Sequence, residues 1–197
     1  RYSYDKCRAN DFRLKPSKSQ LAKTQVDFLG ITLSRDGIRP QARKVELISR
    51  LKPPKNATGL RSFIATCQFF RRHIAGLSEI IAIFRPLLKK NAPWAWLPEH
   101  QQAFDQLKSA LKSEKVVLKY PDFNMPFAIA VDSSSNATSW ILMNRTPTGY
   151  RPIQYGGRLF SAAKSKRHST YLELCGIVSA VLACHKYLAH AEFEIIT

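Results

Sequence analysis

The sequence predicts an α+β fold, in which a small strand hairpin and a group of helices precede a mixed sheet. Three observations predict this order: short apolar runs open the chain, helical apolar spacing follows between residues 40 and 111, and strand-like runs return after residue 115. The last part reads strand, strand, strand, helix, strand. An apolar share of 45% over 197 residues is sufficient for a hydrophobic core.

The opening strands are expected in three short apolar runs: Phe12–Lys15, Gln25–Leu29 and Ile31–Ser34. Asp36-Gly37 supplies the turn signal that follows them. Gly30 lies between the second and third runs, where a glycine indicates either a β-bulge or a close backbone approach.

The helical part is expected to begin at Pro40, because proline suits the first turn of a helix. The apolar face of this first helix is Val45, Ile48 and Leu51. Further helices are expected over residues 60–74, 78–84 and 98–111. Ser78 is the expected cap of the second of these, and Phe104, Leu107 and Leu111 form the buried face of the third.

The final sheet is expected to contain four strand-like runs before its helix: Val116–Tyr120, Pro126–Asp132, Ser139–Asn144 and Arg151–Tyr155. Leu172–Tyr187 has helical spacing, and Phe193–Thr197 is one more strand. The predicted core-facing residues of this helix are Leu174, Ile177, Val178, Val181, Leu182 and Leu188.

The charge of the chain indicates its class of partner. It carries 31 Lys and Arg against 14 Asp and Glu, a formal net charge of +17. This excess favours nucleic acid, with a merely solubilising surface as the alternative. No apolar run reaches the roughly 18 residues of a membrane span, and no signal peptide opens the chain, so no membrane is expected. The four cysteines lack CxxC spacing and indicate reduced thiols in a cytoplasmic or nuclear protein that is not secreted.

Two carboxylates stand where a site could form. Asp132 ends an apolar strand, where it either faces a metal or cleft or caps the next turn through its own backbone. Glu173 lies near a helix start, where it either joins a site or interacts favourably with the helix dipole. The two can converge on a divalent cation, but their spacing along the chain does not decide this.

The other candidate constellations are weaker. The five histidines have no metal-ligand spacing, and no GxxxxGK[ST], GxSxG or HExxH motif is present. Phe69-Phe70-Arg71-Arg72 could stack on bases and bind phosphate, although two helical aromatics are also typical of a core with solvated arginines beside it.

Many short motifs follow one another in an order and spacing typical of one family. The first group is Leu14–Lys18, Val26–Gly30, Gly37–Pro40 and Lys44-Val45. The second group is Pro53–Lys55, Leu60–Phe63, Phe69–Ile74, Pro86–Lys90, Trp96, Ala103-Phe104 and Leu107-Lys108. The third group is Pro121–Phe123, Pro126-Phe127, Asp132–Ser134, Arg151–Ile153, Arg158, Glu173-Leu174 and Ile177-Val178. Together they resemble the pol polyprotein of LTR retrotransposons of the Ty3/gypsy type, over nearly the whole chain.

The resemblance divides the chain into three parts. Residues 1–36 resemble the end of a reverse-transcriptase palm with its primer-grip hairpin, residues 37–114 the helical thumb and connection, and residues 115–197 the N-terminal part of an RNase H-like domain. The last part is then a truncated RNase H-like mixed sheet, with three antiparallel strands, a helix and a parallel fourth strand.

The family cuts the RNA strand of an RNA–DNA hybrid with two Mg²⁺ ions held by four carboxylates. By position, the resemblance makes Asp132 the first and Glu173 the second of these catalytic, metal-binding carboxylates. The third is expected directly after Thr197. With two of four carboxylates, this chain alone is expected to bind Mg²⁺ weakly and to be an inactive endonuclease.

Polymerisation needs a Tyr-x-Asp-Asp turn, which does not occur in these residues. The resemblance therefore implies a reverse-transcriptase fragment that holds an RNA–DNA hybrid or template–primer duplex, with the rest of a pol polyprotein as a further partner. The expected nucleic-acid-binding residues are Phe28, Leu29, Gly30, Lys44, Arg61, Arg71 and Arg72. The alternative is a host-retained, non-catalytic nucleic-acid-binding protein.

One departure from the family concerns the strand after Asp132. The family usually has two glycines among small residues there, whereas this chain has Ala137, Ser139 and the bulky Trp140. Trp140 is therefore expected to require repacking of this strand.

Overall fold

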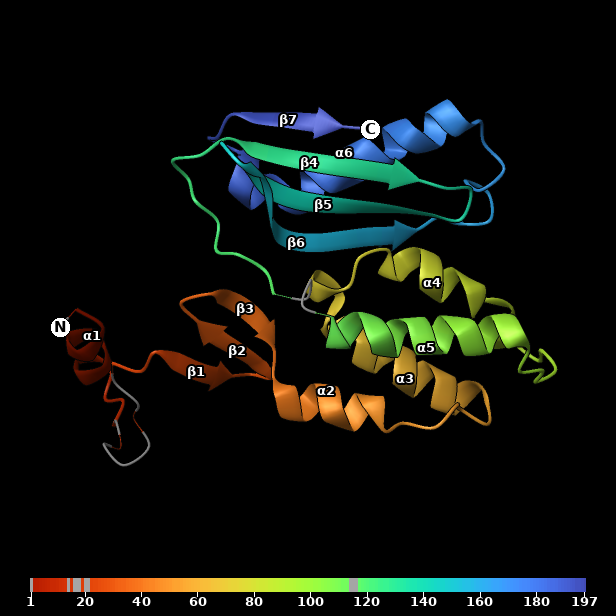
Figure 1. The fold of residues 1–197 in the computed structure, drawn as a ribbon, viewed down its shortest axis with the longest axis horizontal. Helices are drawn as coiled ribbons and strands as arrows, with labels where there is room; N and C mark the ends of the chain where they lie inside the picture. The colour runs from red at the N-terminus through yellow and green to blue at the C-terminus, as the bar shows by residue number, and fades with distance from the viewer. Residues whose placement is uncertain (1, 14, 16–18, 20–21, 114–116) are drawn as a thin grey trace.

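The computed structural model describes residues 2–13, 15, 19, 22–113 and 117–197. The fold is α+β, as predicted, with a three-stranded sheet, a group of helices and a four-stranded mixed sheet (Figure 1). In chain order the elements are α1 (Tyr2–Ala9), β1 (Gln25–Phe28), β2 (Ile31–Ser34), β3 (Gly37–Pro40), α2 (Ala42–Ser49), α3 (Ala57–Phe69), η2 (Arg71–His73), α4 (Leu77–Ile83), η3 (Pro86–Leu88), α5 (Pro98–Lys112), β4 (Phe127–Ser133), β5 (Ala137–Thr146), β6 (Gly149–Leu159), α6 (Ser169–Leu188) and β7 (Phe193–Ile196).

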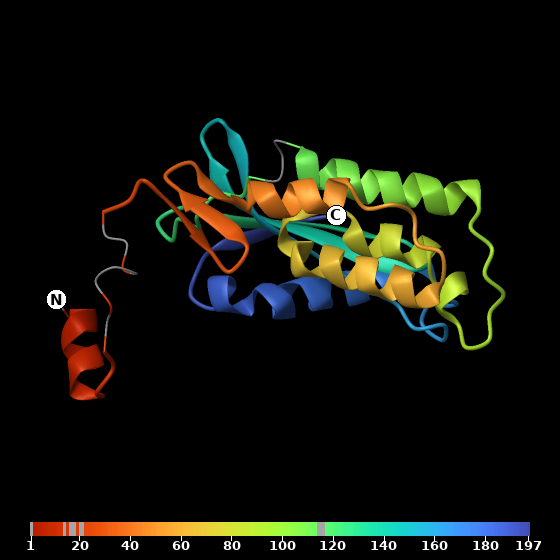
Figure 2. The ribbon, with the colours of Figure 1, turned by 90° about the horizontal axis from the view of Figure 1, so that it is seen from below.

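The predicted strand Phe12–Lys15 is wrong for those of its residues that the structure describes. Phe12, Arg13 and Lys15 lie outside any helix or strand, and Leu14 lies outside the described residues. Phe12 is 71% exposed, so its side chain supplies no burial that would favour a strand. The helix α1, which the sequence analysis did not predict, lies apart from the other elements (Figure 2).

The small sheet has the order β1-β2-β3, with both pairs antiparallel. The helix predicted to begin at Pro40 begins instead at Ala42, because Gly37–Pro40 forms a third strand. Ile38 pairs with β2 on one side and exchanges backbone hydrogen bonds with Leu118 on the other, at 2.8 and 2.9 Å. The fixed φ of proline is compatible with a strand end as well as with a helix start. The pairing of Ile38 with β2 and Leu118 therefore determines that Gly37–Pro40 is a strand.

The predicted strand Val116–Tyr120 is also wrong over its described part. Val116 lies outside the described residues, and Leu118 forms only an isolated bridge with Ile38. The Lys119 backbone N–H donates to the carbonyl of Pro152 in β6 at 2.8 Å. This short segment therefore connects the edge of the small sheet to the mixed sheet instead of joining either as a strand.

The helices enclose one hydrophobic core. α5 begins at Pro98 and buries Phe104, Leu107 and Leu111, which confirms the predicted face. Ser78 is not the cap of α4: the N-cap is Gly76, whose φ of 62° is left-handed. Leu51 follows the end of α2 and is exposed, so the predicted face of the first helix is buried fully only at Ile48.

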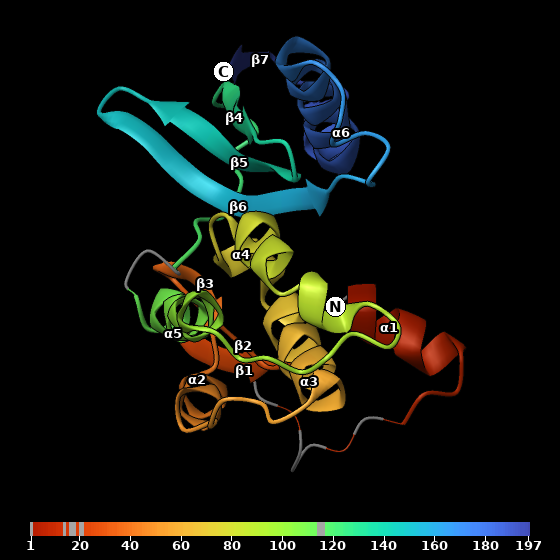
Figure 3. The ribbon, with the colours of Figure 1, turned by 90° about the vertical axis from the view of Figure 1, so that its right-hand side faces the viewer.

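The mixed sheet has the order β6-β5-β4-β7, in which β4, β5 and β6 are antiparallel and β7 runs parallel to β4. This confirms the predicted succession of three antiparallel strands, a helix and a parallel strand. α6 covers one face of the sheet, and α4 packs against β5 and β6 from the helical layer (Figure 3).

The contact between the two layers is close. A Cβ atom on Gly157 of β6 would lie 2.6 Å from the Ser78 hydroxyl of α4. The Arg85 guanidinium donates to the carbonyl of Phe160 at 3.0 Å. The mixed sheet therefore packs directly against the helical layer, with no room between them for a larger residue at position 157.

Trp140 is accommodated without loss of its strand. It pairs in register with Gly156 of β6, and a Cβ atom on that glycine would lie 2.3 Å from the indole. The Trp140 side chain is buried and belongs to the core of the mixed sheet. The missing side chain of Gly156 therefore supplies the space that the bulky residue needs.

The predicted core face of α6 is wrong at three positions. Leu174, Val178 and Leu182 are 58%, 58% and 68% exposed. Leu188 is buried as predicted, and the other buried residues of α6 are Leu172, Gly176, Ala180 and Cys184. Small residues let the helix lie close to the sheet, which turns the larger side chains outward. By length and composition α6 could also span a membrane, but this weak signal is shared by core helices, and α6 packs on β4 and β5.

Candidate functional site

The structure brings Asp132 and Glu173 together. Both line a small cavity of about 70 Å³ with Val131, Ser133 and Thr197. Asp132 lies near the end of β4 and Glu173 in the first turns of α6, and these two ends meet on the same side of the mixed sheet (Figure 1). Both carboxylates are exposed to solvent. They are therefore accessible to a ligand that enters from outside.

A close approach of α6 to the sheet sets this arrangement. Gly176 lies one helical turn after Glu173, and a Cβ atom on it would lie 2.3 Å from the Ser133 hydroxyl and 2.6 Å from the Thr138 hydroxyl. Only a glycine lets the helix backbone come this near to the strands. The close approach at Gly176 therefore places the Glu173 turn beside the end of β4.

Two hydroxyl groups fix the backbone at the end of β4. The Ser133 hydroxyl donates to the Thr138 hydroxyl at 3.0 Å, and the Thr138 hydroxyl donates to the carbonyl of Asp132 at 3.2 Å. Thr138 is fully buried. The pair therefore fixes the backbone from which the Asp132 carboxylate extends at the rim of the cavity.

The donor set suits a hard divalent cation in part. Carboxylate oxygens are the protein ligands that Mg²⁺ prefers, and Asp132 and Glu173 supply two such groups. Among the described residues no group of three or more His, Cys, Asp or Glu side chains could hold a metal ion. The two carboxylates therefore fit as part of a ligand set, with the remaining positions left to water or to further ligands.

The predicted nucleic-acid-binding residues fall into separate places. Leu29, Arg71 and Arg72 line one cavity of about 390 Å³, which lies between the small sheet, η2 and β6. Lys119 lines the same cavity, although the sequence analysis did not single it out. The sequence signal that could have identified Lys119 is its place as a cation within the strand-like run Val116–Tyr120. The structure shows that the described part of this run connects the two sheets. Arg71 and Arg72 are exposed, so their guanidinium groups are free to reach an anion.

Gly30 lies beside Phe69, which lines this cavity, and Lys44 lies beside Gly30. A Cβ atom on Gly30 would lie 3.1 Å from the ring of Phe69 and 3.7 Å from the Lys44 side chain. The register of β1 and β2 is unbroken, so the glycine marks a close approach and not a bulge. Leu29 and Gly30 have φ values of 48° and 84°, as in the two-residue turns that join hairpin strands.

Arg61 and Phe28 lie elsewhere. The Arg61 guanidinium donates to the carbonyl of Leu88 at 3.4 Å, on the helical layer. Phe28 is exposed and lines a separate hollow on the small sheet that also contains Tyr120. Of the aromatic pair in α3 and its cap, Phe70 is buried, whereas Phe69 is exposed beside the hairpin turn. The core interpretation thus holds for Phe70 alone.

Comparisons with known proteins identify the family to which this chain belongs. The family model described as the RNase H-like domain found in reverse transcriptase matches residues 96–195. The chain belongs to this family. The match includes β4 and α6, the strand and the helix that carry Asp132 and Glu173.

Relatives are found among pol polyproteins. The chain is 32% identical over 194 residues to the retrovirus-related Pol polyprotein from transposon 412 of Drosophila melanogaster, which covers 98% of this chain and 16% of that protein. It is 33% identical to the Gag-Pol polyprotein of baboon endogenous virus, over 73% of this chain and 8% of the relative. It is 27% identical to the transposon Tf2-3 polyprotein of Schizosaccharomyces pombe, over 93% of this chain and 14% of the relative. This reverse transcriptase/RNase H-like chain therefore spans less than a fifth of these relatives.

Solved structures agree in fold. The foamy viral protease-reverse transcriptase in complex with an RNA/DNA hybrid superposes with a TM-score of 0.75 at 22% identity, over 91% of this chain and 24% of that one. The same viral enzyme in complex with double-stranded DNA gives a TM-score of 0.72 at 21% identity, over 91% of this chain and 37% of that one. The order of small sheet, helices and mixed sheet is thus a known reverse-transcriptase arrangement.

Proposed function

We propose that this chain is the palm-end, thumb, connection and RNase H-like part of a retrotransposon pol polyprotein of the Ty3/gypsy type. The order of motifs along the sequence and the likeness to the transposon 412 and Tf2 polyproteins support this assignment. Residues 1–36, 37–114 and 115–197 then correspond to the palm end, the thumb with connection, and the RNase H-like domain.

We infer that the partner of this chain is an RNA–DNA hybrid or template–primer duplex. The net charge of +17 and the cavity that gathers Arg71, Arg72 and Lys119 support a polyanionic ligand. The foamy viral structures of similar fold hold an RNA/DNA hybrid or double-stranded DNA. Hybrid duplexes are read by shape and backbone, so no sequence preference is expected.

We further propose that the intact polyprotein cleaves RNA in hybrids at the cavity of Asp132 and Glu173. The observation that carries this proposal is that two acids distant in the sequence line one small cavity. The parallel register pairs Ala130 with Ile196, so a residue after Thr197 would come beside Asp132, where the third family carboxylate is expected.

Reverse transcriptase/RNase H-like proteins generally use divalent metals, and Mg²⁺ is the ion we propose here. The carboxylates of Asp132 and Glu173 would hold it, and bound metal in such a site lowers the pKa of water and stabilises a leaving oxygen. The roles of the chain itself are to keep the two acids at a fixed separation, through Gly176, and to keep the backbone of Asp132 in place, through Thr138.

A cleavage assay tests this proposal. A longer pol chain that contains these residues and continues past Thr197 is expected to cleave the RNA of a hybrid duplex with Mg²⁺, and Asp132→Asn is expected to abolish cleavage. Asp36→Asn, the same change at an exposed acid in the turn between β2 and β3, is the matched control and should retain cleavage. Cleavage that survives Asp132→Asn would refute the assigned site. An absence of cleavage with unchanged binding would favour the host-retained binding protein.

Binding is tested separately with the chain itself and a hybrid duplex. The variant Arg71→Ala/Arg72→Ala is expected to weaken binding about 10-fold or more, because each lost phosphate contact removes one released counterion. The variant Lys89→Ala/Lys90→Ala removes the same charge from an exposed pair and should change binding much less. Equal losses in the two variants would show that net charge, and not the cavity, is responsible.

A further inference from the structure

The cavity between the small sheet, η2 and β6 is lined mostly by apolar side chains. Leu118 and Ile153 line it and are 2% and 5% exposed, and Ile31 and Ile38 of the small sheet line it as well. Its volume of about 390 Å³ lies near the lower end of the range of roughly 300–1,000 Å³ in which proteins hold a single small ligand. The cavity therefore has the size and the lining of a site for one ring-bearing group.

One aromatic ring of this cavity is open to solvent and held in place by its neighbours. Phe69 lines the cavity and is 60% exposed. Its ring lies against the hairpin turn, where a Cβ atom on Gly30 would come within 3.1 Å of it. It also makes a T-shaped contact with the ring of the buried Phe70, with 4.8 Å between the centroids. Because these contacts fix the ring in advance, a second ring that packs on it loses little affinity to ordering.

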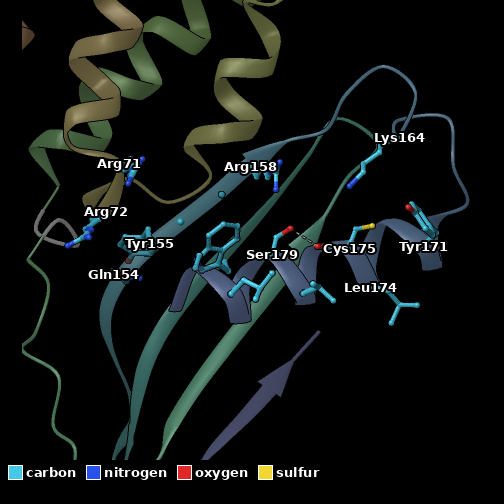
Figure 4. Close-up of a pocket in the computed structure, with 16 residues that line it drawn as sticks. Arg71, Arg72, Gln154, Tyr155, Arg158, Lys164, Tyr171, Leu174, Cys175 and Ser179 are labelled. Carbon is cyan, nitrogen blue, oxygen red and sulfur yellow. Dashed lines mark hydrogen bonds between the residues drawn. The ribbon is translucent and has the colours of Figure 1, made fainter. Parts of the chain in front are cut away.

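Cations stand beside this ring. Arg71 and Arg72 line the cavity and lie next to each other beside β6 (Figure 4). The Lys119 ammonium donates to the carbonyl of Asp36 at 2.7 Å, which leaves N–H groups for a second acceptor. None of the described residues that line the cavity is an Asp or Glu. The charged groups of the cavity therefore favour a phosphate.

A paired duplex uses only part of this arrangement. The bases of a duplex stack on one another, so a protein meets its backbone and its base edges. Its phosphates can pair with the cations, but Phe69 and the apolar lining stay uncovered. An unpaired nucleotide offers a phosphate together with a base whose face is free, and a base that stacks on an aromatic side chain gains roughly 5-fold or more in affinity.

We propose that this cavity holds one unpaired nucleotide of a strand that adjoins the bound duplex. The base stacks on Phe69, and the phosphates pair with Arg71, Arg72 and Lys119. The inference rests on the proposed binding of a hybrid or template–primer duplex, and it adds the kind of nucleotide that enters the cavity. No base is preferred, because every base has a face that can stack.

Fluorescence anisotropy with the 197-residue chain tests the proposal. The probes are a blunt RNA–DNA hybrid, the same hybrid with a single-stranded overhang of about three nucleotides, and the same overhang made of abasic nucleotides. The abasic overhang has the phosphates of the base-bearing one but no bases. The base-bearing overhang is expected to bind roughly 5-fold or more tightly than the abasic one.

Variants of Phe69 locate the stacked base. Phe69→Ala is expected to remove the difference between the base-bearing and the abasic overhang, and Phe69→Trp is expected to retain it, because a larger ring also stacks. The matched control is Phe12→Ala, which truncates another exposed phenylalanine outside the cavity and should leave the difference unchanged. Circular dichroism shows whether each variant is folded.

Two results would overturn the inference and leave the proposed function intact. Equal affinity for the two overhangs would show that the cavity takes phosphates only. A difference that persists in folded Phe69→Ala would show that the base lies elsewhere. Unchanged binding of the blunt hybrid to Arg71→Ala/Arg72→Ala is a separate result, which would refute the proposed binding site and this inference with it.

Discussion

The helices α5 and α6 bury opposite kinds of side chain. α5 presents large residues to the helical core, where Phe104 and Leu107 are 1% and 0% exposed. α6 presents Gly176 and Ala180 to the mixed sheet and leaves Leu182 68% exposed. Burial of large apolar side chains contributes most to stability, whereas small residues permit a close approach. One interface thus stabilises the fold, and the other sets the geometry of a site.

The largest expected effect follows from the interface of α5. Phe104→Ala removes a buried ring that lies 4.5 Å from the ring of Phe63, between centroids, and should lower the free energy of unfolding by about 3–5 kcal/mol. Leu182→Ala, on the exposed face of α6, should change it by about 0.5 kcal/mol or less. Urea unfolding of the two variants measures the difference. Similar losses would show that this face of α6 is buried in solution and would remove the contrast between the helices.

The interface of α6 is tested by Gly176→Ala. The added Cβ would lie 2.3 Å from the Ser133 hydroxyl, so the helix must move away, at a cost of about 1–3 kcal/mol. In a longer pol chain that cleaves RNA, the same change should also weaken divalent metal binding, because Glu173 moves with the helix.

The matched control is Gly59→Ala in α3, where the added atom meets Pro54 at an ordinary 3.4 Å. Alanine favours a helix over glycine by about 1 kcal/mol, so this variant should be neutral or more stable. Isothermal titration with Mn²⁺ and urea unfolding separate the two effects. Unchanged metal affinity in a destabilised Gly176→Ala variant would restrict the glycine to a structural role.

The contrast between the two helices also explains what could be predicted from the sequence. The pattern of α5 has one apolar stripe among polar residues, so Phe104, Leu107 and Leu111 could be assigned to the core. α6 is apolar around most of its circumference, so spacing alone did not identify its buried face. Burial of Gly176 and Ala180 is a property of the tertiary packing, which no local pattern carries.

The same limit applies to the candidate site. The apolar patterns place Asp132 at a strand end and Glu173 near a helix start. These positions are the reason that the two acids could be selected as candidates. Their convergence depends on the contact at Gly176. The wrong strand at Val116–Tyr120 and the wrong helix start at Pro40 have one cause, because Leu118 pairs with Ile38 across a long separation in the chain.

A second close approach in the mixed sheet, between Gly156 and Trp140, is tested by Gly156→Ala. The added Cβ would lie 2.3 Å from the Trp140 indole, so the substitution should destabilise the chain by about 1–3 kcal/mol. Trp140→Leu removes the obstructing ring, so Gly156→Ala should cost less in that background. A double-mutant cycle by urea unfolding measures this coupling. Additive losses would indicate that the glycine serves some purpose other than space for the indole.

The small sheet also contains polar contacts between side chains, and these predict the smallest effect. The Asp27 carboxylate accepts hydrogen bonds from the Thr32 hydroxyl at 2.6 Å and from the Gln41 amide at 2.8 Å, and these bonds lower the pKa of Asp27 below its usual 3.8. Because the folded pKa lies below the unfolded one, the stabilisation is present above pH 3.8 and is lost as the pH falls through the folded value.

Asp27→Asn is therefore expected to reduce stability slightly at neutral pH and to flatten its decline below about pH 4. Since the carboxylate is exposed to solvent, the change should be small beside that of Phe104→Ala. Thermal unfolding of both chains between about pH 3 and pH 7 measures it. An unchanged acid profile in Asp27→Asn would mean that the bonds to Thr32 and Gln41 do not persist in solution, and that the backbone ladder alone holds the small sheet.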